Sequence, residues 1–320
     1  MKGVGLRFGM ARGERLDLDV GGLGPAGVEV LAADLYVPDA VESAPLLVCF
    51  PGGGMNRVYF DLPDGLPGEW SMARYLADHF GIAVAVVDHP GVGESSVPED
   101  PYTLNPRVVA EVDHGAMSEL VAHAMDLFEP TRFVGLGHSM GALIVAHAQW
   151  HHRSFDAVAF LGFGGAGLPE YLTRAEMSYA NSYERLEPVL AELVRERFGT
   201  ALVPEPSTSS DTLNPGAIAG ARQLLAAAST PLLALCGLTS MIPGCSDAAL
   251  ASIEVPVFLG IGENDIAGDI SEVASLLTAS PSVETFVLAE AGHNHSISKN
   301  RTVLWDALGK WVVTLNEREN

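Results

Sequence analysis

Basic residues are scarce in this sequence. Its 18 lysines and arginines stand against 40 aspartates and glutamates, which gives a formal net charge of −22 at pH 7. A protein that binds nucleic acid or an anionic bilayer needs positive charge to neutralise rows of phosphates. The charge therefore argues against a nucleic-acid partner, and it indicates an acidic, soluble surface.

Cysteines and long apolar runs are also scarce. The three cysteines, Cys49, Cys236 and Cys245, have no C-x-x-C spacing, so reduced thiols are expected, although a bridge between Cys236 and Cys245 stays open. No window reaches the roughly 18 apolar residues of a membrane span, and residues 1–20 lack the apolar segment of a secretion signal. We expect a cytoplasmic protein without membrane insertion. The sequence leaves open whether it forms a homodimer.

The 320 residues suffice for one large core with an insertion. Short apolar runs alternate with helical patterns along much of the chain, which predicts an α/β fold with a mostly parallel central sheet and helices on both faces. The predicted strands cover residues 28–37, 45–50, 82–87, 133–136, 155–163, 255–261 and 284–288, and the predicted helices cover residues 69–80, 105–128 and 301–315.

The alternation stops between residues 168 and 253. This stretch has helical patterns at 176–198 and 215–228 but no buried strand in a strand–helix repeat. A connection of that length usually forms a lid or a binding element. We therefore predict a core of residues 1–167 and 254–320 and a helical cap of residues 168–253. Because the cap leaves and rejoins the sheet at one end, we expect it to supply most of an apolar substrate pocket there.

The most informative motif is Gly137-His138-Ser139-Met140-Gly141, which has the form G-x-S-x-G and stands between a predicted strand and an alanine-rich helical pattern. A side chain held on a sharp strand-to-helix turn needs neighbours without a Cβ atom. The helix that follows presents free N–H groups beside the serine. Ser139 could thus attack a carbonyl carbon and have the resulting oxyanion held nearby. The motif is weak by itself, because a glycine-rich chain can match it by chance.

Three other features follow predicted strands. They are the glycine run Gly52–Gly54, Asp265 and His293. In an open α/β sheet the ligand site lies beyond the carboxyl ends of the strands, so these residues are expected to meet Ser139 there. A hydroxyl nucleophile needs a base that titrates near neutral pH, which a histidine supplies, and a buried carboxylate fixes the tautomer of that histidine.

On these residues the chain resembles the α/β-hydrolase-fold serine hydrolases of the esterase and lipase type that carry an inserted cap. The chain order of serine, acid and histidine is the order of that family. The resemblance implies that Ser139 is the nucleophile, Asp265 the acid and His293 the base. It also implies an oxyanion hole made by the backbone N–H groups of Met140 and Gly53, with Gly54 as the alternative because the loop contains three glycines.

Other polar residues compete for these roles or line the site. Glu263 and Asp269 flank the expected acid, and Asp269 lies where it would cap a helix. His295 is a second candidate for the base. His138, His89 and His295 are candidates for the substrate pocket, although a loop histidine such as His89 is more often structural. The remaining histidines lack metal-ligand spacing, so neither a metal nor a cofactor is expected.

Together these features predict a cofactor-free hydrolase that cleaves a carboxylic ester or thioester of a small-molecule acyl substrate through an acyl-enzyme. An acyltransferase and a carbon–carbon bond hydrolase could use the same residues. A non-catalytic ligand receptor could share the fold, but an intact set of Ser139, Asp265 and His293 argues against it.

Overall fold

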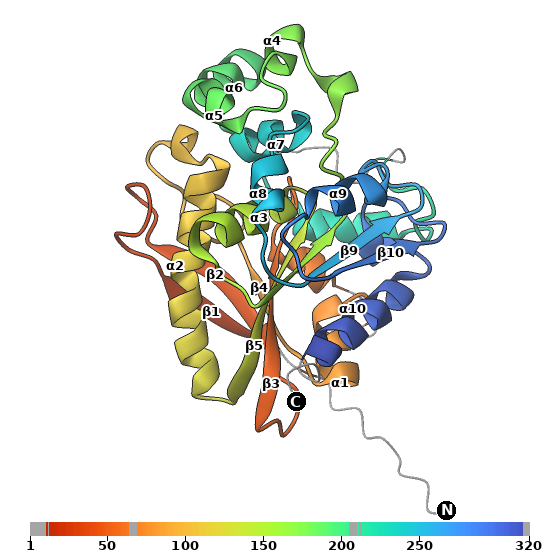
Figure 1. Cartoon of the computed structure of the whole chain (residues 1–320). Helices are drawn as coiled ribbons and strands as arrows, with labels where there is room; N and C mark the ends of the chain where they lie inside the picture. Colours follow the sequence, from red (N-terminus) through yellow and green to blue (C-terminus); the bar gives the residue numbers. More distant parts are fainter. Residues whose placement is uncertain (1–10, 12, 64–68, 205–209, 211–212, 316–320) are drawn as a thin grey trace, which may run out of the picture.

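A computed structural model describes residues 11, 13–63, 69–204, 210 and 213–315. Within them an eight-stranded sheet runs through the molecule in the order β1-β2-β4-β3-β5-β6-β9-β10 (Figure 1). β1 and β2 pair antiparallel with their neighbours, and all pairs from β4 to β10 are parallel. The mostly parallel α/β fold is therefore confirmed. The strands are β1 (Gly13–Asp19), β2 (Val30–Tyr36), β3 (Ser43–Phe50), β4 (Ala83–Val87), β5 (Glu129–His138), β6 (Ala157–Leu161), β9 (Val257–Gly262) and β10 (Val283–Leu288).

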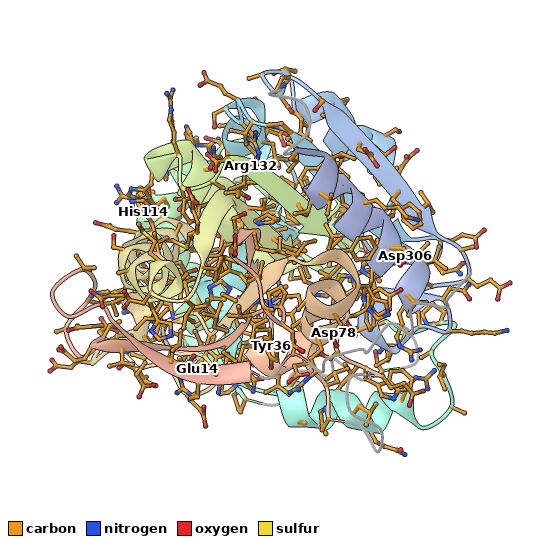
Figure 2. The ribbon with its side chains drawn as sticks, turned by 90° about the horizontal axis from the view of Figure 1, so that it is seen from below. Glu14, Tyr36, Asp78, His114, Arg132 and Asp306 are labelled. Carbon is orange, nitrogen blue, oxygen red and sulfur yellow. The ribbon has the colours of Figure 1, made fainter. Side chains whose placement is uncertain are left out.

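Helices cover both faces of this sheet. In the view from the end opposite the inserted segment, His114 of α2 and Asp306 of α10 lie on opposite sides (Figure 2). One face packs against α2 (Pro106–Met125), α3 (Met140–His152), α8 (Asp247–Ala251) and α9 (Ile270–Leu276), and the other against α1 (Met72–Phe80) and α10 (Arg301–Leu315). Every residue of β4, β6 and β9 is buried, as expected for apolar strands between two helical layers.

Two predicted boundaries differ from the structure in an informative way. β5 begins at Glu129, four residues before the predicted start, because its polar first half pairs with β3 from Ser43 onward. The predicted helix over residues 105–128 ends at Met125. The remaining predicted strands and helices of the core lie within three residues of the observed bounds.

Residues 168–253 differ most from the prediction. The expected helix over 176–198 is divided, because Asn181 adopts a left-handed conformation with φ 61° and Pro188 interrupts the helical hydrogen bonds. The pattern at 215–228 gives only a 3-10 helix, η5 (Ala221–Ala228). The elements before η5 are η3 (Pro169–Tyr171), α4 (Arg174–Met177), α5 (Tyr183–Leu186), η4 (Glu187–Val189), α6 (Leu190–Phe198) and β7 (Leu202–Val203); those after it are β8 (Leu232–Leu233) and α7 (Ala234–Met241).

The inserted segment has two parts that lie in different places. α4, α5, α6 and α7 stand over one end of the sheet (Figure 1). α5, α6 and α7 share a small apolar core that includes Leu186, Leu190 and Leu238. Residues 213–230, which we call the strap, pack instead with the α1 and α10 side of the core through Leu225 and Ala228.

The three cysteines are buried free thiols, so Cys236 and Cys245 do not pair. Among the described residues, each helix is too short or too polar to cross a bilayer. The remaining 3-10 turns are η1 (Arg57–Phe60), η2 (Pro101–Thr103) and η6 (His295–Ile297).

Candidate active site

Ser139 occupies a strained turn between β5 and α3. Its backbone angles are φ 53° and ψ −120°, a combination that residues with a side chain rarely adopt. The turn is possible because Gly137 and Gly141 lack side chains. A Cβ atom on Gly137 would lie 2.4 Å from the backbone nitrogen of Ala142, and one on Gly141 would lie 2.5 Å from the carbonyl oxygen of Phe50. Close packing on both sides therefore holds Ser139 in place.

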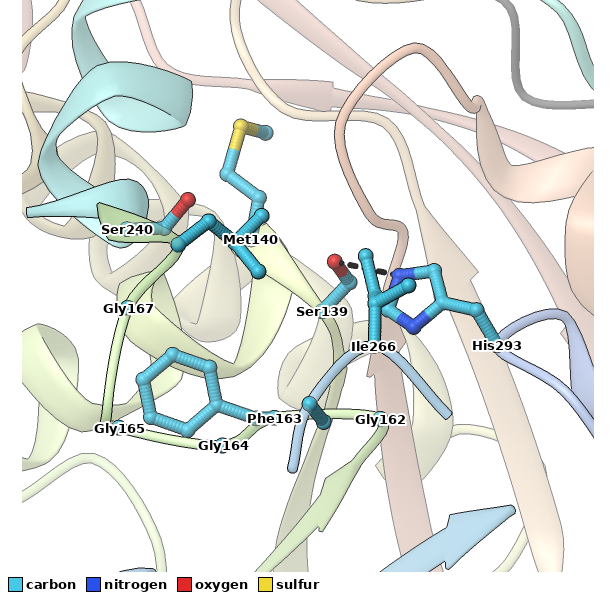
Figure 3. A pocket seen from close by; sticks show the side chains of 12 residues that line it. Ser139, Met140, Gly162, Phe163, Gly164, Gly165, Gly167, Ser240, Ile266 and His293 are labelled. Carbon is cyan, nitrogen blue, oxygen red and sulfur yellow. Dashed lines mark hydrogen bonds between the residues drawn. The ribbon is translucent and has the colours of Figure 1, made fainter. Parts of the chain in front are cut away.

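The structure brings Ser139, His293 and Asp265 together. Nε2 of His293 lies 2.9 Å from Oγ of Ser139 (Figure 3). Nδ1 of His293 lies 2.7 Å from Oδ1 of Asp265. The three residues follow β5, β10 and β9, as their positions in the sequence predict. Asp269 instead caps α9 by accepting from the N–H of Ser271, which agrees with the prediction.

The Asp265 carboxylate accepts hydrogen bonds on both oxygens. Its side chain is fully buried. Oδ1 also accepts from the N–H of Ala267 at 3.0 Å, and Oδ2 lies 3.0 Å from Nε2 of His295. Burial opposes ionisation, but the charge and hydrogen bonds of His293 and His295 outweigh it and hold the pKa of Asp265 well below its usual range. The carboxylate therefore remains charged.

Of the two histidines in the terminal loop, only His293 is hydrogen-bonded to Ser139 among the described residues. His295 is buried with Nε2 toward Asp265, so it holds the carboxylate from the other side. This places His295, a candidate for the base and for the pocket, behind the site, where it contacts the acid. The sequence could not distinguish the two, because both follow β10 within one short loop.

The other two histidines also serve as supports. Nε2 of His138 donates to the carbonyl oxygen of His293 at 2.9 Å, and burial holds the pKa of His138 well below its usual value, so the ring is neutral. His89 is fully buried, with Nδ1 2.6 Å from Oδ2 of Asp113 and Nε2 3.3 Å from the carbonyl oxygen of Pro51. His89 is thus held as a structural residue, the role that the sequence favoured over a place in the pocket. Asp113 lies within α2, where no sequence signal marks it.

The glycine run after β3 lies directly against the nucleophile. A Cβ atom on Gly52 would lie 3.1 Å from Cβ of Ser139, and one on Gly53 would lie 3.8 Å from Cβ of Met140 and 2.6 Å from a methyl of Leu232. Gly53 is therefore next to the first residue of α3. The carbonyl of Gly54 is turned to the strap and accepts from the N–H of Thr230.

The sequence model of the alpha/beta hydrolase family matches residues 47–306, which is more than half of the chain. The chain belongs to the alpha/beta hydrolase family. It is accordingly a hydrolase, and the predicted resemblance and fold are confirmed. A comparison with curated proteins gave no match.

Solved structures show the same fold as this alpha/beta hydrolase, at identities too low to show more. A highly thermostable carboxyl esterase from Bacillus coagulans has a TM-score of 0.64 at 17% identity, over 96% of this chain and 100% of that one. A thermophilic esterase from Thermogutta terrifontis has a TM-score of 0.57 at 16% identity, over 95% of this chain and 99% of that one. The enol-lactonase from Burkholderia xenovorans LB400 has a TM-score of 0.55 at 17% identity, over 90% of this chain and 98% of that one.

In this alpha/beta hydrolase the strap connects two loops of the site. The carbonyl of Leu213, at one end, accepts from the N–H of His293 at 2.8 Å. At the other end, the carbonyl of Ala228 accepts from the N–H of Asn56, and the N–H of Thr230 donates to Gly54. These bonds use backbone atoms only, so no side-chain pattern in the sequence could reveal them. The strap fixes the loop of His293 relative to the glycine run.

Two small cavities open beside the nucleophile, and both touch Ser139, His293 and Ile266. The β6-loop cavity, of about 50 Å³, is further lined by Met140, Gly162, Phe163, Gly164, Gly165, Gly167, Leu168, Ser240 and Ala267. The β3-loop cavity, of about 80 Å³, is further lined by Gly52, Gly53, Met55, His138, Leu213 and Asn294.

The walls of these cavities come mainly from the core. The inserted segment supplies only Leu168, Ser240 and Leu213 to the described lining. The described lining of these two cavities thus contradicts the prediction that residues 168–253 form most of the pocket. The reason is geometric: α5, α6 and α7 pack on a separate small core, so the loops after β3, β6 and β9 line most of the two cavities.

Proposed function

We propose that this hydrolase cleaves carboxylic esters or thioesters through an acyl-enzyme formed on Ser139. The observation that carries the proposal is the continuous hydrogen-bonded chain from Ser139 Oγ through both nitrogens of His293 to the buried carboxylate of Asp265. A nucleophile, a base and a group that orients the base are the three parts that activate a serine hydroxyl.

The proposed reaction follows from this arrangement. Asp265 accepts from Nδ1–H of His293, which leaves Nε2 free to take the hydroxyl proton as Oγ attacks the carbonyl carbon. The negative oxygen that forms is stabilised by the backbone N–H groups of Met140 and Gly53. Gly53 is preferred over Gly54 because it lines the cavity and lies beside Met140. Removing one such donor costs on the order of 10²- to 10³-fold in rate.

The second half of the proposed reaction returns the enzyme to its unacylated state. The imidazolium of His293 gives its proton to the departing alcohol or thiol, and the acyl group stays on Oγ. Water then loses a proton to Nε2 and attacks the acyl carbon, which releases the acid and restores Ser139. In this proposal residues 1–167 and 254–320 are the catalytic core, and residues 168–253 are a cap whose strap holds the loops of His293 and Gly54.

The test uses p-nitrophenyl acetate and a fluorophosphonate probe. We expect a burst of one p-nitrophenol per enzyme followed by turnover, and a stoichiometric adduct on the peptide that contains Ser139. A protein that binds the ester but releases no product and takes no label would be a receptor, which contradicts the proposal. Transfer of the acyl group to an added alcohol in place of water would make it an acyltransferase.

The pH dependence provides an independent prediction. A histidine base must be neutral, so kcat/KM for an uncharged ester should fall as the pH drops from about 8 to about 5. Asp265 cannot cause this fall, because its pKa is held well below its usual range and it stays ionised throughout. The measurement is kcat/KM from about pH 5 to 9, with thermal unfolding as a control at each pH. A flat profile would show that no imidazole takes the proton.

A further inference from the structure

The side chain of Ile266 borders both cavities beside Ser139. Ile266 follows Asp265 directly and lines both the β6-loop and the β3-loop cavity. In the close view of one cavity, its side chain lies beside Ser139 and His293 (Figure 3). A substrate whose carbonyl carbon reaches Oγ of Ser139 therefore passes next to Ile266.

Both cavities are small for a ligand site. Their volumes of about 50 and about 80 Å³ compare with roughly 300–1,000 Å³ for pockets that enclose drug-sized ligands. Each cavity therefore suits a short group. Because Ile266 borders both spaces, its side chain limits the groups on either side of a scissile carbonyl.

The walls of the β6-loop cavity are held by backbone contacts. A Cβ atom on Gly164 would lie 1.6 Å from the carbonyl oxygen of Ala267, and one on Gly167 would lie 2.4 Å from that of Met241. The loop after β6 is thus packed against both the Asp265 loop and α7, and neither wall can move back without displacing the other. Ile266 is itself stiff, because a β-branched side chain has few rotamers.

The lining carries no cationic side chain that could recognise an acid. Among the described residues around the two cavities, none is lysine or arginine. His138 is neutral, and the charge of Asp265 is buried against His293 and His295. A carboxylate or phosphate on the substrate would lose its hydration without gaining an opposite charge, which is costly. The site therefore suits an uncharged molecule.

From these observations we propose that the substrate is an uncharged ester with a compact group on each side of the carbonyl, and that Ile266 sets the size limit. The proposal rests on the serine-hydrolase function above. It assigns specificity to a side chain of the core rather than to α4, α5 and α6.

The test measures proton release from two series of unactivated esters. In one series the alcohol is methanol and the acyl group grows from acetate to hexanoate; in the other the acyl group is acetate and the alcohol grows from methyl to hexyl. We expect kcat/KM to fall at least about 10-fold along each series, since poor fit of a hydrocarbon group in a binding pocket has effects of that size. Monomethyl succinate, which is anionic, should be at least about 10-fold slower than methyl butyrate.

The variant Ile266→Ala widens both cavities where Ile266 borders them. It should raise the rate for the longest esters relative to methyl acetate by about 10-fold or more. Ile266→Val, a smaller change, should move the ratio in the same direction and serves if the alanine variant is unstable. Ile270→Ala is the matched control, because Ile270 packs at the edge of the core and lies outside both linings. It should keep the profile of the parent.

The outcomes separate this proposal from the proposed function. If Ser139 takes the fluorophosphonate label but the parent prefers hexanoate, or hydrolyses monomethyl succinate as fast as methyl butyrate, the compact uncharged substrate is refuted while the mechanism stands. An unchanged length ratio in both Ile266 variants would refute the role of Ile266. If Ser139 takes no label and no ester is cleaved, the proposed function itself fails.

Discussion

Replacing Ser139 with alanine is expected to lower kcat by about 10⁶-fold, the size of the effect seen when a triad serine is removed. The attacking oxygen is lost, and neither His293 nor Asp265 can take its place. Alanine has the same Cβ atom as serine, so the strain of φ 53° is no greater than before. The substitution removes one hydrogen bond, that to Nε2 of His293. The fold should therefore be retained.

The measurement combines burst kinetics with p-nitrophenyl acetate and thermal unfolding of both proteins. Ser275→Ala is a suitable control, because Ser275 is exposed on α9 and its hydroxyl bonds only to the local backbone carbonyl of Glu272 in the described structure. Near-parental burst amplitude in Ser139→Ala, with an unchanged unfolding transition, would mean that another residue carries the acyl group.

The positions of the candidate active-site residues could be predicted because each is tied to a strand end. An apolar run buried on both faces marks a strand of a parallel sheet, and the residue that follows it must lie at the ligand end. Ser139, Asp265 and His293 all satisfy this rule, and the structure brings them within hydrogen-bonding distance. The glycines at positions 137 and 141 also predicted the sharp turn that exposes Ser139.

The supports of these residues could not be predicted in the same way. The roles of His89, His138 and His295 depend on which neighbour each ring meets, and those neighbours come from distant parts of the chain. His89 meets Asp113 of α2, and His138 meets the backbone of His293. A lone histidine gives no pattern that specifies such a partner. The sequence therefore offered all three only as candidates for the pocket, and of these His138 is among the described residues that line the two cavities.

The inserted segment, residues 168–253, shows a different limit of prediction from sequence. Helical periodicity over residues 176–198 is real, because α4, α5 and α6 all lie within or next to it. The pattern does not show where a helix breaks and turns, which here depends on the left-handed Asn181 and on Pro188. Nor does it reveal the strap, whose contacts to His293 and Gly54 are made by backbone atoms. For these two reasons the sequence assigned most of the pocket lining to residues 168–253.

Replacing Asp265 with alanine should lower kcat by about 10⁴-fold, as removal of a triad acid does elsewhere. Four donors, from His293, His295, Ala267 and Gly262, lose their acceptor. His293 then has no group that fixes its proton on Nδ1 or stabilises its charged form. The measurement is single-turnover acylation by p-nitrophenyl acetate. Asp269→Asn is the control, because asparagine keeps the cap of α9.

Asp265→Asn makes the prediction sharper, because the surroundings of the carboxylate decide how the amide turns. Oδ1 accepts from His293 at 2.7 Å and from the N–H of Ala267 at 3.0 Å, whereas Oδ2 accepts from His295 at 3.0 Å and from the N–H of Gly262 only at the longer distance of 3.4 Å. The amide oxygen should therefore take the place of Oδ1, and the NH₂ group should face His295, which can accept on Nε2 in its other tautomer. His293 then keeps its proton on Nδ1, and the loss of rate comes from the missing charge alone.

We expect Asp265→Asn to acylate at least about 10-fold faster than Asp265→Ala, since a triad asparagine that instead reverses the tautomer costs about 10⁴-fold. Equal rates in the two variants would contradict this orientation, and an alanine variant within about 10-fold of the parent would show that Asp265 is not the acid.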